Sequence, residues 1–346
     1  MNRIRVALVG LGRMGRNHLK TILESRDFEL VAVVDECKPN DVDLPKTSLF
    51  LKSVDELTSL DIDAAIVATP SETHYAVAAQ LLAQKIHVLV EKPASSTSNE
   101  AKKLVSLAQE HSVTLAVGQV ERCNPVVRSL KKILDSGLLG DPIHIETKRG
   151  GGFPLNVKPG NDVILDLAIH DLDLLRFLFG PLSVTHSAGH VTKLAGIFDT
   201  ISIQLQTIYG STASVHANWL SPQKVRSINI VGKTACCDVN YMAQECVLYG
   251  ANLSPSAVET SLGPVEELDH PFAKSFRLKV PKGLPLSIQM DEWKSFILGG
   301  SSCLSSGDAL IRSVELTEIA LQLAQKSVHQ PNTTVDRKSD TEAGLV

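Results

Sequence analysis

Short apolar runs alternate with amphipathic segments through the first third of the chain. The apolar runs predict strands at residues 4–10, 29–35, 64–70, 86–93 and 114–119. Between these runs, apolar residues recur at helical spacing near 13–24, 53–60, 73–84 and 97–111. Strands that are apolar on both faces and separated by helices indicate a parallel sheet with helices on both sides. We therefore expect a doubly wound α/β domain over residues 1–121.

The pattern of apolar and polar residues changes after residue 121. Helical patterns at 124–137 and 163–179 flank a strand-like segment at 142–149, and alternating segments follow at 200–208, 212–220 and 225–232. Alternation without long intervening helices is typical of an antiparallel sheet with one packed face. We expect an α+β domain with a large, mostly antiparallel open sheet over residues 122–327, then a polar tail over 328–346. Two further helical patterns, 288–298 and 307–325, are candidates to pack back on the first domain.

Composition narrows the class of protein. A chain of 346 residues is too long for one ordinary core, which agrees with two domains. The net charge is −4 with both signs interspersed, so we expect no nucleic-acid partner. Six cysteines without a CxxC pair predict reduced thiols and no metal site. No apolar run reaches the roughly 18 residues of a membrane span. The start, "MNRIRVALVG", enters a strand pattern without a targeting signal, so we expect a cytoplasmic protein.

A glycine motif follows the first predicted strand. In "VGLGRMGRNH", Gly10, Gly12 and Gly15 have the GxGxxG spacing that permits a tight turn, close approach of a pyrophosphate and close helix packing. Asp35 ends the second strand, where a carboxylate can hold ribose hydroxyls and repel a 2′-phosphate. The alternative, glycines that only make a turn, is weaker because the motif joins a strand to a helix. We expect a Rossmann domain that binds NAD rather than NADP.

Polar residues stand at the carboxyl ends of three predicted strands. These ends read "ATP" (68–70), "EKP" (91–93) and "GQ" (118–119), and ligands of doubly wound sheets lie beyond such ends. Lys92 therefore projects toward the cofactor crevice. Glu91 points to the opposite side and is expected to be mainly structural, because side chains alternate along a strand.

Together, the glycine motif, Asp35, "ATPSETH" (68–74) and "EKP" resemble the Gfo/Idh/MocA oxidoreductases, NAD(P)-dependent dehydrogenases that act largely on sugars and cyclitols. The resemblance covers nearly the whole chain. It implies that the residues around the cofactor are Gly10, Gly12, Arg13, Met14, Gly15, Asp35, Thr69, Pro70, His74, Glu91, Lys92 and Gln119.

A second group of polar residues lies in "VILDLAIHDLDLLRFLFG". Asp166, His170 and Asp173 follow at i, i+4 and i+7, which places them on one face of an α-helix. A buried histidine hydrogen bond with a structural role would explain the spacing equally well. By resemblance, Asp166 and His170 join Lys92 as the catalytic residues. Removing a hydroxyl proton suits His170, Lys92 can stabilise charge on the same oxygen, and Asp166 would orient substrate or base.

A third match narrows the substrate class. "GQVERCNP" and "TKRGGGFP" are similar to the UDP-N-acetylglucosamine 3-dehydrogenase subgroup, although Cys123 replaces the phenylalanine that its members commonly carry. The resemblance implies that Arg122 and Asn124 line the sugar pocket beside Asp166 and His170. Arg149 and Lys158 are candidates for the diphosphate, because guanidinium and ammonium groups suit phosphate oxygens. A solvated side chain is the ordinary alternative, and for Lys158 it is the stronger one.

Three functions follow from these patterns. The leading one is NAD-dependent oxidation of the C3 hydroxyl of UDP-N-acetylglucosamine, a nucleotide sugar, to a 3-keto sugar. An NAD(P)-dependent dehydrogenase of a free sugar or inositol is the alternative within enzymes. A non-catalytic NAD-binding sensor would need none of Lys92, Asp166 and His170. Because an open sheet commonly requires a partner on its exposed face, we also expect a homodimer or homotetramer.

Overall fold

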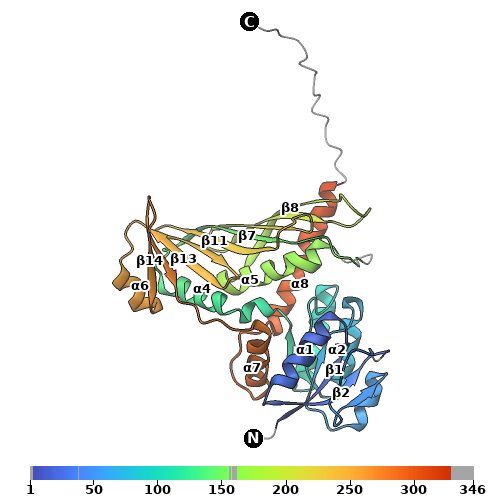
Figure 1. Cartoon of the computed structure of the whole chain (residues 1–346). Helices are drawn as coiled ribbons and strands as arrows, with labels where there is room; N and C mark the ends of the chain where they lie inside the picture. Colours follow the sequence, from blue (N-terminus) through green and yellow to red (C-terminus); the bar gives the residue numbers. More distant parts are fainter. Residues whose placement is uncertain (1–2, 38, 156, 158–161, 329–346) are drawn as a thin grey trace.

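The computed structural model describes residues 3–37, 39–155, 157 and 162–328. Its first part is a six-stranded parallel sheet with the strand order β3-β2-β1-β4-β5-β6 (Figure 1). The strands are β1 (Ile4–Val9), β2 (Phe28–Val34), β3 (Leu49–Leu51), β4 (Ala64–Val67), β5 (His87–Val90) and β6 (Leu115–Val117). The order reverses between β1 and β4, and such a reversal opens a crevice at the carboxyl ends of the strands.

The helices of this part connect its parallel strands. They are α1 (Arg13–Glu24), α2 (His74–Ala83) and α3 (Ser98–Glu110), as the apolar periodicity predicts. The predicted helix at 53–60 is a short 3₁₀ helix, Val54–Ser59, which Ser53 caps. All five predicted strands are confirmed, but each ends earlier than predicted, before Gly10 in β1 and before the polar residues that were included in the other four. The Rossmann fold is therefore confirmed, and those polar residues lie in the loops beyond the sheet.

The second sheet is larger and mostly antiparallel. Its order is β14-β15-β13-β12-β11-β7-β10-β9-β8, and the β7–β10 pair is parallel. The strands are β7 (Pro142–Gly150), β8 (Leu182–His190), β9 (Thr200–Thr207), β10 (Thr212–Asn218), β11 (Val225–Gly232), β12 (Cys236–Asn240), β13 (Glu245–Gly250), β14 (Val265–Leu268) and β15 (Lys274–Leu278). The predicted antiparallel sheet is confirmed.

Helices cover one face of this sheet. α4 (Pro125–Ser136) and α5 (Ile169–Phe179) lie between the sheet and the Rossmann part, while α6 (Pro255–Leu262) packs against α4 near the β14 end (Figure 1). A π-helical turn, Ile164–Ala168, leads into α5. Alternation along β7 turns Ile145, Thr147 and Arg149 toward the helices, where all three are buried.

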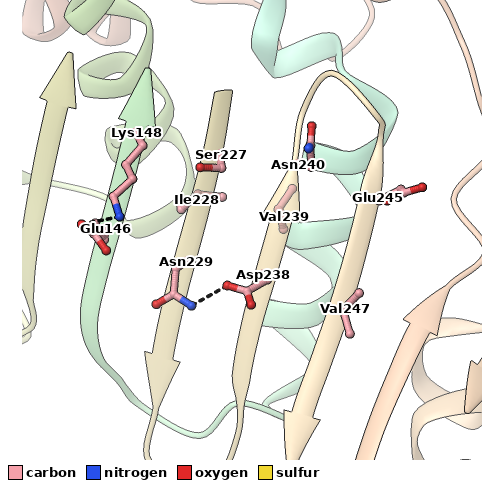
Figure 2. A pocket seen from close by; sticks show the side chains of 10 residues that line it. All are labelled: Glu146, Lys148, Ser227, Ile228, Asn229, Asp238, Val239, Asn240, Glu245 and Val247. Atoms are coloured by element: carbon pink, nitrogen blue, oxygen red, sulfur yellow. Dashed lines mark hydrogen bonds and ion pairs between the residues drawn. The ribbon is translucent and has the colours of Figure 1, made fainter. Parts of the chain in front are cut away.

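The opposite face of the sheet is polar. Figure 2 shows a hollow on this face, where Asn229 donates to Asp238 at 2.6 Å and Lys148 lies 3.3 Å from Glu146. Each of these side chains belongs to the outward set of its strand. This part of the far side of the sheet therefore carries two pairs of polar side chains.

The last two helices join the two parts. α7 (Pro285–Ile297) packs on α1. Its Trp293 also stacks on Phe28 of β2, with 5.8 Å between the ring centres. α8 (Gly307–Val328) contacts α3 and β6 of the first sheet and α5 and β8 of the second. None of the helices in the described part of the chain combines the length and the apolarity that crossing a membrane requires.

Candidate active site

The glycine motif forms the turn between β1 and α1. Gly10 has φ +99°, and a Cβ there would lie 2.6 Å from the Ala68 carbonyl oxygen. A Cβ on Gly15 would lie 2.0 Å from the Gly10 carbonyl oxygen, whereas a Cβ on Gly12 would meet nothing within 4 Å. Packing therefore requires Gly10 and Gly15, while Gly12 borders open space at the start of α1.

The groups around this open space fit a dinucleotide. No side chain caps the first turn of α1, and that turn carries no acidic residue, so its N–H groups can donate hydrogen bonds to phosphate oxygens. Asp35 follows β2, and its carboxylate accepts a hydrogen bond from the Leu11 N–H at 2.6 Å. Thr69 and Pro70 follow β4 on the other side of the crevice. Arg13 is exposed and Met14 half-buried in the same first turn.

Lys92 connects the two parts of the molecule. Its Nζ atom donates to the Asp166 backbone carbonyl at 2.6 Å and to Asp166 Oδ1 at 3.2 Å. Trp219 Nε1 donates to Asp166 Oδ2 at 3.1 Å. Burial alone would raise the pKa of Asp166, but Lys92, Trp219 and the nearby Arg13 hold it below its usual value. Asp166 is therefore an ionised carboxylate that fixes the Lys92 ammonium beside the crevice.

His170 lies in the first turn of α5. Its Nδ1 is 3.1 Å from the side-chain oxygen of Gln119, so Nδ1 carries the proton and Nε2 is the basic nitrogen. Burial, and then the positive charges of Lys92, Arg149 and Arg226, lower the pKa of His170 well below its usual value. The imidazole is therefore neutral near pH 7, which is the form that can accept a proton.

Asp173 does not join this group. Its carboxylate accepts from Arg122, Ser305 and Ser313 in a separate buried cluster. The expectation that all three residues share one face does not hold for Asp166, because its turn is π-helical, whereas His170 and Asp173 keep α-helical spacing within α5.

Arg149 was expected to face a diphosphate, and this expectation is wrong. Its side chain is 1% exposed. Nε and Nη2 donate to the two oxygens of Asp171 at 2.8 and 3.0 Å, and Nη1 donates to Glu121 at 3.0 Å. The alternation of β7 directs the side chain inward, so its donors are already bonded within the protein.

Arg122 and Asn124 do not line an open pocket either. Arg122 is 4% exposed and makes two bonds to Asp173, at 2.7 and 2.6 Å. Asn124 is 3% exposed, caps α4 by accepting from the Val126 N–H, and donates to the Tyr241 carbonyl. Both side chains hold the segment after β6 in place. Lys158, the other diphosphate candidate, lies outside the described residues.

Two residues expected around the cofactor also have other partners. His74 is 2% exposed, and its ring nitrogens bond to the carbonyls of Pro93 and Thr69 at 2.7 and 2.8 Å. Glu91 is 8% exposed and bonds to His18 at 2.7 Å, which agrees with a structural role. Both side chains are therefore bonded within the protein, and their contact with the cofactor stays a prediction.

Arg226 is a residue that the sequence patterns did not single out. It begins the inward set of β11 and pairs across the sheet with Arg149. Its Nη1 lies 3.3 Å from the same Glu121 oxygen that Arg149 contacts, yet 30% of its side chain is exposed. Its alternation with Ile228 and Ile230 in "VRSINIVG" was the signal that could have found it.

Comparison with known proteins assigns the family. Residues 4–119 match the oxidoreductase family with the NAD-binding Rossmann fold, and residues 127–237 match the GFO/IDH/MocA C-terminal domain. The chain belongs to the Gfo/Idh/MocA oxidoreductase family. It is accordingly an NAD-dependent dehydrogenase that acts on a CH–OH group of a sugar or inositol.

Relatives within the Gfo/Idh/MocA family differ in substrate. UDP-N-acetylglucosamine 3-dehydrogenase of Acidithiobacillus ferrooxidans is 29% identical over 74% of this chain and 80% of its own. scyllo-Inositol 2-dehydrogenase (NAD⁺) of Bacillus subtilis is 30% identical over 64% of this chain and 69% of its own. A crystal structure of the Acidithiobacillus enzyme covers 95% of this chain and all of its own, with a TM-score of 0.79 and 22% identity.

Proposed function

We propose that this dehydrogenase oxidises the C3 hydroxyl of UDP-N-acetylglucosamine to the 3-keto sugar. The observation that carries the catalytic part is the convergence of Lys92, Asp166 and His170 from two domains beside the glycine turn. The name of the Acidithiobacillus relative supports the choice of sugar.

In this proposal, His170 Nε2 accepts the proton of the substrate hydroxyl. Gln119 holds the opposite nitrogen protonated, so the imidazole keeps the tautomer that a base requires. The Lys92 ammonium stabilises the negative charge that develops on the same oxygen. NAD, when bound, accepts the hydride from the carbinol carbon. Asp166 holds Lys92 in position, and Trp219 holds Asp166 in turn.

Arg226 supports the nucleotide part of the substrate. Its positive charge helps to lower the pKa of His170. Its side chain is partly exposed at the edge of the buried cluster of Arg149, Asp171 and Glu121. Because the Arg149 side chain is 1% exposed and bonded to Asp171 and Glu121, whereas Arg226 is 30% exposed, Arg226 is the better placed guanidinium for a diphosphate oxygen. This assignment replaces Arg149 in the proposed substrate contacts.

A substrate panel tests the function. Purified protein is mixed with NAD and UDP-N-acetylhexosamines, free hexoses or inositols, and reduced nicotinamide is followed by absorbance. An amine-transfer enzyme added to half of the samples removes the ketone and draws the equilibrium forward. We expect turnover with UDP-N-acetylglucosamine. Turnover with inositol alone would favour the alternative that the Bacillus relative suggests, and binding of NAD without any turnover would favour a sensor.

Substitutions test the catalytic residues. We expect Lys92→Ala and His170→Ala to abolish hydride transfer, while calorimetry finds NAD affinity little changed. Lys103→Ala and His190→Ala are the matched controls, because both side chains are exposed on other elements. Rates near those of the unmodified protein for Lys92→Ala or His170→Ala would refute the assignment.

We also infer a homodimer or homotetramer that uses the open face of the large sheet. The arrangement of the large sheet supports this inference, because the helices of the described residues lie on one face and leave the other face open for a second copy (Figure 1). Light scattering of the purified chain measures the mass of the assembly, and a monomer at every concentration would exclude the inference.

A further inference from the structure

Two cysteines meet where the two parts of the chain join. Cys123 ends the 3₁₀ turn that follows β6, and Cys303 lies in the link between α7 and α8. Their Sγ atoms are 3.9 Å apart, although the residues are 180 positions apart in sequence. Cys123 is buried and Cys303 is partly exposed. The proposed catalytic steps use neither thiol.

The surroundings of Cys303 favour a thiolate. Arg128 Nη2 donates to its Sγ atom at 3.5 Å, the Cys123 Sγ atom lies 3.9 Å away, and the Arg122 carbonyl oxygen lies 3.8 Å away. The contact with Cys123, with help from Arg128, lowers the pKa of Cys303 despite burial and the nearby Glu292. Thiolate character together with access to solvent is what makes a cysteine reactive.

Other thiols in the described part of the chain lack this combination. Cys237 and Cys246 lie closer together, with Sγ atoms 3.3 Å apart, but both are fully buried between β12 and β13. The contact with Cys246 and burial raise the pKa of Cys237 well above its usual value. Cys37 is exposed. The distance between the sulfurs alone would favour oxidation of Cys237 and Cys246, whereas the expected reactivity of the thiols favours oxidation of Cys123 and Cys303.

We propose that Cys123 and Cys303 form a reversible oxidation site that reacts with hydroperoxides. The Cys303 thiolate attacks one peroxide oxygen, the O–O bond breaks, and the Cys303 sulfenic acid forms after the departing alkoxide takes up a proton. The Cys123 sulfur then attacks the Cys303 sulfur, the S–O bond breaks, and the Cys123 proton leaves with the hydroxyl group as water. Overall, two thiols and one hydroperoxide give one disulfide, one alcohol and one water.

The local structure allows the second step. A disulfide requires an S–S distance of about 2.05 Å, so the sulfurs must approach from their present contact. The backbone around Cys303 is held, since its N–H donates to Glu292 at 3.0 Å and its carbonyl accepts from Arg122 at 3.3 Å. Side-chain rotation of the partly exposed Cys303 is therefore the motion that closes the bond.

Peptide mapping tests the site. The reduced full-length chain is treated with hydrogen peroxide, free thiols are alkylated, and the unreduced digest is analysed by mass spectrometry. We expect a linked pair of peptides carrying Cys123 and Cys303, two hydrogen masses lighter than their sum, which dithiothreitol separates. Cys123→Ala should accumulate a dimedone-reactive sulfenic acid at Cys303, and Cys303→Ser should leave Cys123 unmodified.

Two comparisons keep the test decisive. Arg128→Gln should slow alkylation of Cys303 by iodoacetamide about threefold or more at neutral pH, while the alkylation rate of Cys37 stays unchanged. Circular dichroism confirms that each variant is folded. Linkage of Cys237 to Cys246 before Cys123 to Cys303, or oxidation of Cys37 alone, would overturn the proposal.

Discussion

Substitution of Gly12 by alanine separates the cofactor role of the glycine turn from its folding role. Gly12 has φ −64° and ψ −169°, which alanine adopts freely, and its new Cβ would have no neighbour within 4 Å. In the absence of NAD, alanine should therefore leave the protein as stable or stabilise it by about 0.4–1 kcal/mol. The methyl group would occupy the space that the pyrophosphate must enter.

The expected magnitude for Gly12→Ala is at least a tenfold loss of NAD affinity, or about 1.4 kcal/mol. At an NAD concentration 100 times the original Kd, bound ligand stabilises the unmodified protein by about 2.7 kcal/mol. A tenfold weaker variant at the same concentration should gain only about 1.4 kcal/mol from the ligand. The NAD-dependent rise in Tm should therefore fall to about half.

Thermal unfolding with and without NAD, together with calorimetry, measures both effects. Gly15→Ala is the matched control, because its Cβ would lie 2.0 Å from the Gly10 carbonyl oxygen and force the backbone apart. That variant should lose about 1–3 kcal/mol of stability before any ligand is added. If Gly12→Ala binds NAD as tightly as the unmodified protein, the open space beside Gly12 does not receive the cofactor.

Three further predictions concern the charged residues. Asp171→Asn should lower the free energy of unfolding, measured by urea titration, by about 3–5 kcal/mol, because it removes a negative charge that pairs with the buried Arg149. The same change at the exposed Asp135 is the control and should lower it by less than about 0.5 kcal/mol. Since the pKa of His170 is depressed and its neutral form is the base, kcat/KM should stay level as pH falls to 6.5 and decline only below it; a limb centred above 6.5 would contradict this. Arg226→Gln should raise KM for a UDP-sugar at least tenfold while changing KM for an uncharged sugar much less, and equal effects on the KM of both substrates would exclude a phosphate contact.

Local patterns of apolar and polar residues were sufficient to predict the two-domain architecture. Short apolar runs predicted the strands of the Rossmann part and helical spacing predicted the main helices, because each of these elements buries apolar side chains. β3 was missed because three residues are too few to show a period. Residues 250–285, which carry no clear period, contain α6, β14 and β15, whose places depend on neighbouring strands.

The site was harder to predict because its partners are distant in sequence. Arg122 and Asp173 are 51 positions apart, and no local pattern links them. Arg149 is different: Ile145 and Thr147 precede it at strand spacing, so the alternation itself indicated a buried side chain. The diphosphate assignment followed from the charge of Arg149, whereas the alternation along the strand correctly indicated that its side chain points toward the core.

The Lys92–Asp166 contact also bears on how substrate enters and product leaves. Its two side chains belong to different domains, so any widening of the gap between the domains must break it. Because Lys92 and Asp166 are only 17% and 32% exposed and Lys92 also donates to the Asp166 carbonyl, separating them costs more than the roughly 0–1 kcal/mol of an exposed ion pair. The contact therefore aligns the Lys92 ammonium while the two domains are together, and it opposes their separation.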